Sequence, residues 1–296
     1  MTTALRAVTV DEAAAFHRDG AVLIPQVLDA GWLDLLAAGL EAAYTDPDAM
    51  SVDLEGATGP GVIRIDQFPA ARCPQLMEFV TGSPVASIVG TVLDGPVRFY
   101  MDQMFYKPAG EMLATAWHQD TPYYNVEGAD LVRAWVSPDP APRAASLEVV
   151  RGSHRWNVTY APRNADGVRT YREVPNSEAN EFRYGDAPVD RSLPTVPDIE
   201  GHRDSYDVLG WDYQPGDVIL FAGNILHGAG GQVTLDHARR AHASLWAGDD
   251  VTYTVRAGQV IPDPAALAAH AAQPGQYLSD FPDVFPTVWA PERTQP

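Results

Sequence analysis

The segment 117–120 (Trp-His-Gln-Asp) holds the densest group of ligand-type side chains in the sequence. In an extended strand, residues i and i+2 point to the same side, so the imidazole of His118 and the carboxylate of Asp120 converge. One neutral imidazole nitrogen and one carboxylate oxygen are two of the ligands of a 2-His-1-carboxylate facial triad, which leaves open positions on Fe(II). Taken alone, His-x-Asp is a common pair, and a surface ion pair is its simpler explanation.

The third candidate ligand is His227, which follows the apolar segment 217–226 and precedes a glycine. Taken alone, a histidine after an apolar strand is more often structural. Here the segment 214–217 (Gln-Pro-Gly-Asp) is typical of a turn that starts a core strand. His118 and His227 are 109 residues apart, which suits ligands contributed by opposite strands of a jelly roll.

Arg239 and Arg240 lie on the next predicted strand, where Arg239 comes twelve residues after His227. A guanidinium binds a carboxylate with two parallel hydrogen bonds, which suits the distal carboxylate of 2-oxoglutarate. Strand alternation groups Arg239 with Ala241 and Ala243 on one face and puts Arg240 on the other. We therefore expect Arg239 to point inward toward the cosubstrate and Arg240 to lie at the surface.

The elements that must position these residues change in type along the chain. The first hundred residues indicate helices around a short strand at 21–25, with a capping-box pattern at Thr9 and Glu12. Helices are predicted over 29–44 and, in two pieces, over 74–93. From residue 97, strand-length runs separated by Gly- and Pro-rich joints favour a β-sandwich or barrel. These runs are 97–106, 113–120, 129–137, 145–150, 217–223 and 239–247.

Composition narrows the function further. The 296 residues include 46% hydrophobic side chains and no run near ~18 apolar residues, so we expect a folded protein without a membrane span. The net charge of −19 argues against nucleic acid or anionic membrane as a partner. The only cysteine is Cys73, and charged residues interrupt the N-terminal segment, so we expect a cytoplasmic protein. Lys107 is the only lysine, and the Gly-Lys-Ser/Thr motif of a P-loop is absent.

Residues 151–203 differ from the rest of the chain. They contain eight arginines, eight acidic residues and five prolines, and they show no clear periodicity. A connection of this length is uncommon unless it is a lid or is disordered. We expect a lid-like insertion between two core strands, with disorder as the alternative.

These motifs together resemble the phytanoyl-CoA dioxygenase-like family of Fe(II)/2-oxoglutarate oxygenases, over most of the chain. The resemblance rests on residues 10–12, 16–25, 107–108, 118–120, 147–154, 215–217, 227–228 and 239–241. It implies that His118, Asp120 and His227 bind Fe(II), that Arg239 binds 2-oxoglutarate, and that O₂ is the oxidant.

The resemblance also implies that Gln103, Thr115 and Trp135 lie near the cosubstrate. It implies a turn rather than a ligand at His154.

Two features depart from the family pattern. Ala144 and Ala145 stand where many members have Asn-Gly, and Ala229 stands where many have a serine that helps to bind the cosubstrate. One missing hydrogen bond costs ~1 kcal/mol, which is too little to abolish binding. Asp120 is present, which disfavours halogenation.

The predicted fold is mainly β with flanking helices, built on a double-stranded β-helix (jelly-roll, cupin-like) core over residues 97–255. Residues 1–96 are expected to be mostly helical support and residues 256–296 a C-terminal extension, all within one domain of residues 1–296. The predicted reaction is hydroxylation of an unactivated C–H bond in a small molecule of natural-product, amino-acid or lipid origin, with release of succinate and CO₂. Candidate substrate contacts are Tyr106, Tyr123, Tyr124 and Trp211, although core packing explains each equally well.

Three alternatives remain open from the sequence. The same cofactors support desaturation, cyclisation or epoxidation, depending on how the substrate is placed. A non-catalytic jelly-roll binding protein would not need the complete triad with Arg239. A metal-dependent hydrolase or isomerase would not need the arginine.

Overall fold

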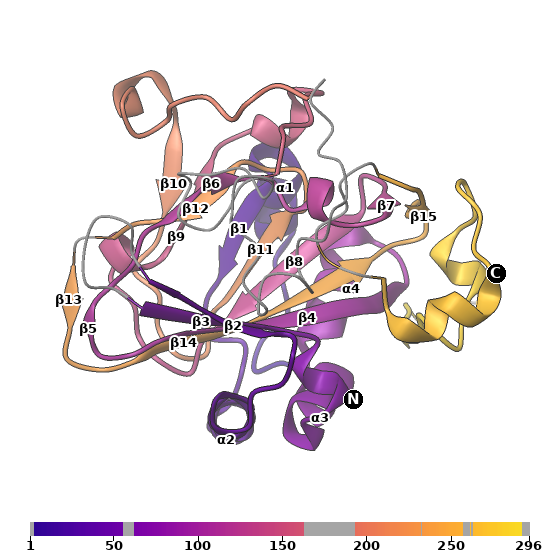
Figure 1. Cartoon of the computed structure of the whole chain (residues 1–296), viewed down its shortest axis with the longest axis horizontal. Coiled ribbons are helices and arrows are strands. Elements are labelled where there is room, and N and C mark those ends of the chain that lie inside the picture. Colours follow the sequence, from indigo (N-terminus) through magenta and orange to yellow (C-terminus); the bar gives the residue numbers. More distant parts are fainter. Residues whose placement is uncertain are drawn as a thin grey trace.

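The computed structural model describes residues 3–55, 62–162, 193–231, 233–256, 261 and 263–291. Its centre is a roll of two antiparallel sheets, with helices packed on the outside of the larger one (Figure 1). The predicted jelly-roll core is confirmed.

The larger sheet has eight strands in the order β1-β11-β8-β14-β4-β3-β2, and β16 also pairs with β4. Every pairing is antiparallel, and many join strands that are far apart in sequence. The strands are β1 (Ala21–Ile24), β2 (Ser51–Glu55), β3 (Val62–Gln67), β4 (Val97–Lys107), β8 (Leu131–Val136), β11 (Val218–Ala222), β14 (Arg239–Ala247) and β16 (Thr287–Trp289).

The smaller sheet has the order β10-β9-β12-β6. Its strands are β6 (Thr115–His118), β9 (Leu147–Val150), β10 (Val208–Gly210) and β12 (His227–Ala229). Two further pairs join β5 (Gly110–Glu111) to β13 (Thr234–Leu235) and β7 (Val126–Glu127) to β15 (Thr252–Tyr253).

The α-helices are α1 (Val10–Asp19), α2 (Ala30–Thr45), α3 (Pro74–Gly82) and α4 (Val85–Leu93). Thr9 and Glu12 form the predicted capping box of α1, and Asp29 caps α2. Pro84 separates α3 from α4, as predicted. By length and composition the stretch Pro74–Leu93 could cross a membrane, but 61% of its apolar window is buried inside the protein, as in the core helix of a globular fold.

Short 3₁₀ helices connect these elements. They are η1 (Pro69–Ala71), η2 (Thr121–Tyr123), η3 (Arg143–Ala145), η4 (Ser153–Arg155), η5 (Arg203–Ser205), η6 (Ala265–His270) and η7 (Leu278–Asp280). Within η4, the ring of His154 lies against Gly20, where a Cβ atom would come within 2.2 Å of Nδ1. Gly20 also ends α1 with a φ of +82°. Both this backbone conformation and the close contact with the His154 ring therefore require glycine. His154 is therefore a packing residue of a turn, as predicted.

Segments outside residues 97–255 also add strands to the roll. The first part of the chain carries the expected helices and the expected strand β1, and β2 and β3 also join the larger sheet. The C-terminal part is also more than an extension, because β16 pairs with β4 and the ring of Phe285 stacks on that of Tyr100 at 5.4 Å. Most of the predicted insertion, residues 163–192, lies outside the described residues.

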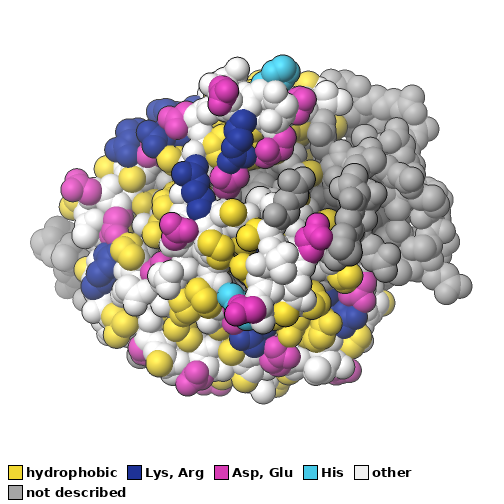
Figure 2. Space-filling view, turned by 90° about the vertical axis from the view of Figure 1, so that its left-hand side faces the viewer, with side chains coloured by type: hydrophobic (Ala, Val, Ile, Leu, Met, Phe, Trp, Pro, Cys, Tyr) yellow, Lys and Arg dark blue, Asp and Glu magenta, His cyan; other side chains and the backbone are white. Residues whose placement is uncertain are grey.

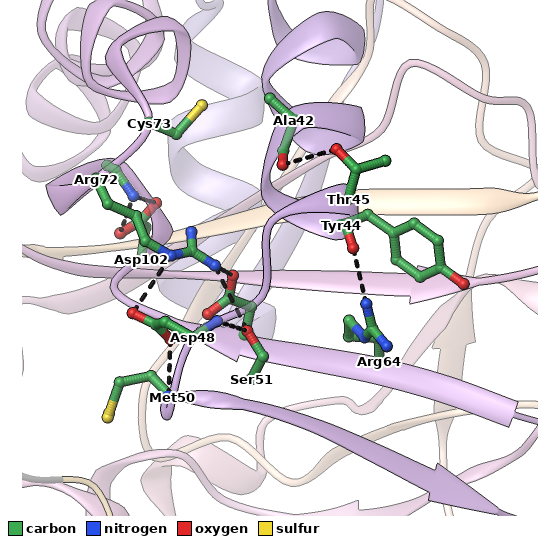
Figure 3. A network of polar contacts seen from close by, with 12 residues as sticks. Ala42, Tyr44, Thr45, Asp48, Met50, Ser51, Arg64, Arg72, Cys73 and Asp102 are labelled. Atoms are coloured by element: carbon green, nitrogen blue, oxygen red, sulfur yellow. Dashed lines mark hydrogen bonds and ion pairs between the residues drawn. The ribbon is translucent and has the colours of Figure 1, made fainter.

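A polar network ties the end of α2 and η1 to the edge of the larger sheet (Figure 3). Arg72 forms ion pairs with the buried Asp66 and with Asp48. The backbone N–H of Ala70 donates to Asp102 at 3.0 Å. This network fixes β3 and β4, two strands that carry residues of the site described below.

Burial raises the pKa of Asp66 to about 6, against the opposing effect of the Arg72 charge. The folded state therefore holds this proton more tightly than the unfolded state, whose carboxyl has a pKa near its usual 3.8. Protonation of Asp66 stabilises the fold fully below about pH 3.8, and this stabilisation is lost as the pH rises through about 6.

Asp66→Asn imitates the protonated carboxyl at every pH. We expect its free energy of unfolding to increase relative to that of the wild type from about pH 4 to about pH 7, because the wild type loses stability as Asp66 ionises. Urea denaturation at a series of pH values measures this trend. Asp53→Asn removes an exposed carboxylate from a sheet-edge ion pair with Arg64 and is the control. An equal trend in both variants would contradict the assignment.

Candidate metal centre

Pairing between β6 and β12 brings the two candidate histidines together. His227 lies directly opposite His118, and their ring centroids are 4.2 Å apart. Ala229 lies opposite Thr115, so a bulge of one extra residue in β6 stands against Gly228. A Cβ atom on Gly228 would lie 2.8 Å from the carbonyl oxygen of Thr115, so this close approach requires glycine.

Asp120 follows β6 and joins the histidines through the turn that precedes β12. The backbone N–H groups of Asp120 and Thr121 donate to the carbonyl of Gly223 at 2.9 and 2.8 Å. Oδ1 of Asp120 then lies 3.7 Å from Nε2 of His118 and 3.6 Å from Nε2 of His227. The three candidate ligand atoms all lie within 4.8 Å of one another.

Backbone carbonyls select which nitrogen of each histidine faces the centre. Nδ1 of His118 bonds to the carbonyl of Ala116 at 2.8 Å, and Nδ1 of His227 to that of Ile225 at 3.1 Å. Each Nδ1 therefore carries the proton as the donor, and each Nε2 keeps its lone pair for a metal. Burial lowers the pKa of both rings, that of His227 to about 3, so both are neutral at neutral pH.

The carboxylate completes a donor set that fits iron. Burial acts to raise the pKa of Asp120, but the charge of Arg133, with smaller contributions from the two histidines, outweighs it, and the net shift is downward. Asp120 is therefore ionised beside two neutral imidazoles. Two imidazole nitrogens and one carboxylate oxygen on one side of a centre are the ligands of a facial triad for Fe(II).

The two adjacent arginines of β14 lie on opposite faces, as alternation predicts. The guanidinium of Arg239 is buried in the roll, where Nη1 donates to the carbonyl of Ala145 at 2.8 Å. Its Nε has no hydrogen-bond partner in the described part of the chain. Arg240 instead forms ion pairs with Asp139 at 2.7 Å and Glu41 at 2.9 Å on the outer side.

A second buried cation stands opposite the first. Lys107 pairs with Arg239 in the register of β4 and β14, and its Nζ donates to the carbonyl of Leu113. Burial and the neighbouring guanidinium hold the pKa of Lys107 well below its usual value, and burial lowers that of Arg239 to about 10. The sequence singled out Lys107 as the lone lysine but not as a site residue, because only the strand register shows the pairing.

The predicted cosubstrate contacts share the inner side of the roll. Gln103 and Trp135 both lie beside Ala243, one on each neighbouring strand. The Arg239 guanidinium lies 5.7 Å from the centre of the Trp135 ring. Because of the bulge, Thr115 lies on the same side of β6 as His118. The structure thus groups these residues with the triad and Arg239.

The predicted substrate residues divide into two pairs. The Tyr123 ring lies edge-on to His118, with centroids 5.8 Å apart, and the Tyr124 hydroxyl lies among the buried groups behind Asp120. Tyr106 is not brought to the site, because it stands opposite Arg240 on the outer face and bonds to Glu41 at 3.0 Å.

Trp211 is half-buried and packs against the main hydrophobic core. This packing accounts for the residue without any substrate contact.

Sequence reasoning missed Arg133 altogether. Its side chain is 1% exposed, and its Nε donates to Oδ2 of Asp120 at 2.9 Å. A signal was present, since a charged residue interrupts the apolar run of β8, and such a charge needs a buried partner. The identity of that partner follows only from the three-dimensional arrangement.

The model of the family described as "Phytanoyl-CoA dioxygenase (PhyH)" matches residues 16–241 of this chain. The chain belongs to the phytanoyl-CoA dioxygenase family. This confirms the resemblance inferred from the motifs.

A curated member of similar sequence is the ectoine dioxygenase of Sphingopyxis alaskensis. It is 26% identical over 234 residues, which are 77% of this chain and 72% of the relative. This chain of the phytanoyl-CoA dioxygenase family is therefore an Fe(II)/2-oxoglutarate-dependent oxygenase, and its cofactors are Fe(II), 2-oxoglutarate and O₂. The alternatives of a non-catalytic binding protein and of a hydrolase or isomerase without 2-oxoglutarate are set aside.

Solved structures share the fold of this family member. The α-ketoglutarate-dependent epimerase SnoN from nogalamycin biosynthesis has a TM-score of 0.69 at 19% identity and covers 94% of this chain and 97% of its own. The carbocyclase SnoK from the same biosynthesis has a TM-score of 0.62 at 17% identity, with coverage of 92% and 93%. EctD from S. alaskensis with 2-oxoglutarate and 5-hydroxyectoine has a TM-score of 0.60 at 19% identity, with coverage of 89% and 88%.

His118→Ala and His227→Ala should each abolish tight Fe(II) binding while leaving the fold intact. Each removes one ligand, and neither ring carries a buried charge. Anaerobic Fe(II) titration with circular dichroism measures both effects. Asp120→Ala would also leave Arg133 buried without its carboxylate, so Asp120→Asn is the better carboxylate variant. Wild-type affinity in any of the three would exclude that residue as a ligand.

Proposed function

We propose that this oxygenase hydroxylates an unactivated C–H bond of a small molecule, with His118, Asp120 and His227 as the iron ligands. Succinate and CO₂ are the products of the cosubstrate. The observation that supports 2-oxoglutarate chemistry at this triad is the pair of buried basic side chains, Arg239 and Lys107, on the inner side of the same roll. A triad alone would suit several kinds of metal enzyme.

The cations suit the distal carboxylate of 2-oxoglutarate. Two like charges buried together cost free energy unless an anion accompanies them. Among the residues that the structure describes, the Nε–H of Arg239 has no partner, and a guanidinium and an ammonium together can donate to both oxygens of a carboxylate. Ala229 lacks the hydroxyl that many members place nearby, so in this chain the two cations carry more of the binding.

Each part of the site has a definite task. The triad holds its three donor atoms on one side, which leaves the other side for cosubstrate and oxygen. Bound Fe(II), with 2-oxoglutarate and O₂, supplies the oxidising chemistry that breaks a C–H bond. Trp135, whose ring lies 5.7 Å from the Arg239 guanidinium, would shield a cosubstrate bound there from water. Tyr123, edge-on to His118, is positioned to contact a substrate next to the centre.

The substrate class is inferred from the relatives. The relatives are described as acting on ectoine or as an epimerase and a carbocyclase of nogalamycin biosynthesis, all of which concern small molecules. We therefore favour a natural-product or amino-acid-derived substrate. Epimerisation, cyclisation, desaturation and epoxidation use the same cofactors and are the alternatives.

Arg239→Met should raise the apparent 2-oxoglutarate constant at least about tenfold, because a charge-assisted pair is worth more than the ~1.4 kcal/mol that a factor of ten requires. Arg240→Met, which removes the outward-facing neighbour, is the matched control and should change the constant little. Anaerobic titration of the Fe(II) protein with 2-oxoglutarate, followed by its visible charge-transfer absorption, measures the constant without any substrate. If the control shows the larger effect, the cosubstrate does not bind at Arg239.

A screen of small-molecule substrates tests the reaction itself. Succinate release identifies a substrate, and the product mass identifies the outcome. A gain of one oxygen supports hydroxylation, although epoxidation gives the same mass and is separated by analysis of the product's bonds. Loss of two hydrogens indicates desaturation or cyclisation, and an unchanged mass indicates epimerisation. Either of the last two results would overturn the hydroxylation proposal but not the cofactor assignment.

A further inference from the structure

Arg133 is a charged residue in an apolar row of the larger sheet. On β8 it lies between Leu245 of β14 and Phe221 of β11, and its side chain is 1% exposed. A guanidinium in this position is costly unless all of its donors are used.

Contacts of all three nitrogen atoms fix the guanidinium in place. Nε donates to Oδ2 of Asp120 at 2.9 Å, and Nη2 donates to the hydroxyl of Tyr124 at 2.5 Å. Nη1 donates to the backbone carbonyl of Ala243 at 3.1 Å. A strand carbonyl and a buried tyrosine hold Nη1 and Nη2 of the guanidinium. Nε therefore donates to Asp120 from a fixed direction.

This contact makes the two carboxylate oxygens of Asp120 unequal. Oδ1 faces both candidate histidine ligands, whereas Oδ2 is taken by Arg133. A carboxylate that used both oxygens on a metal would occupy one of the positions that the cosubstrate and oxygen need. We infer that Arg133 is a positioning residue that restricts Asp120 to a single metal-binding oxygen. The inference rests on the metal centre proposed above.

The same guanidinium also links the carboxylate to a predicted cosubstrate contact. The Tyr124 hydroxyl that accepts from Arg133 donates to Oε1 of Gln103 at 3.4 Å. Nε2 of Gln103 in turn donates to Oε1 of Gln67 at 2.8 Å. These hydrogen bonds extend the network from the carboxylate to β4 and β3.

The test uses Co(II), whose visible absorption reports its coordination, titrated anaerobically into the apo-protein. Arg133→Met should weaken Co(II) binding by about 10- to 100-fold, the usual cost of losing an outer partner of a metal ligand, and should change the absorption bands. Arg98→Met is the matched control, because Arg98 is a buried arginine of the same sheet paired with Asp249, away from the triad. It should leave both the affinity and the spectrum unchanged.

A double variant separates positioning from general stability. In an Asp120→Asn background, Arg133→Met should cause little further loss of Co(II) affinity, because its effect passes through the carboxylate. Equal losses in the two backgrounds would overturn the inference. Arg133→Lys keeps the charge but cannot reach Asp120 and Tyr124 together, so we expect a folded protein with an altered spectrum.

Wild-type affinity and spectrum in Arg133→Met would overturn the inference even if the variant melted at a lower temperature. If Arg133→Met does not fold, the same wild-type result in Arg133→Lys overturns it. His227→Ala serves as the reference for the metal centre itself. Undiminished Co(II) binding in that variant would refute the proposed centre, and this failure is distinct from a failure confined to Arg133.

Discussion

The cross-strand pair of His118 and His227 is the constraint on which the site depends. Two short strands of the smaller sheet hold the rings 4.2 Å apart, and Gly228 permits the close approach of the backbones beside them. The carbonyl of Gly223 accepts hydrogen bonds from the turn that carries Asp120 and holds this turn beside the histidines. The site is therefore held mainly by backbone pairing, which tolerates changes of side chain elsewhere in the roll.

The distribution of charge inside the roll differs from that of the whole protein. The chain carries a net charge of −19, and acidic and basic side chains are interspersed on the face drawn in Figure 2. Three basic side chains nevertheless lie buried around the site: Arg133, Arg239 and Lys107. Asp120 neutralises only Arg133. The remaining positive charge suits a dianionic cosubstrate, which an acidic surface would otherwise repel.

Local rules account for what the sequence predicted correctly. Alternation along one strand was enough to separate Arg239 from Arg240. The His-x-Asp spacing identified two ligand candidates, but Asp120 lies beyond the end of β6, and a turn held by Gly223 rather than strand alternation brings it to His118. Tyr106 was expected near the substrate, but the same alternation places its side chain on the outer face of the sheet, opposite Arg240. Lys107 and Arg133 could not be assigned, since their partners lie on strands that are distant in sequence. The pairing of β1 with β11 was likewise invisible, because nothing local specifies which strands become neighbours.

The grouping of the site residues also indicates where reaction specificity must arise. The histidines, Arg239, Lys107, Gln103 and Trp135 all lie on strands, so the sheet geometry fixes their directions. Proteins with this fold are described as an epimerase and a carbocyclase, so a shared roll does not determine the outcome. What remains free to vary is the set of connections beside the triad, such as η2 with Tyr123. Because such connections tolerate change without disturbing the sheets, they can reposition a substrate while the metal and cosubstrate stay in place.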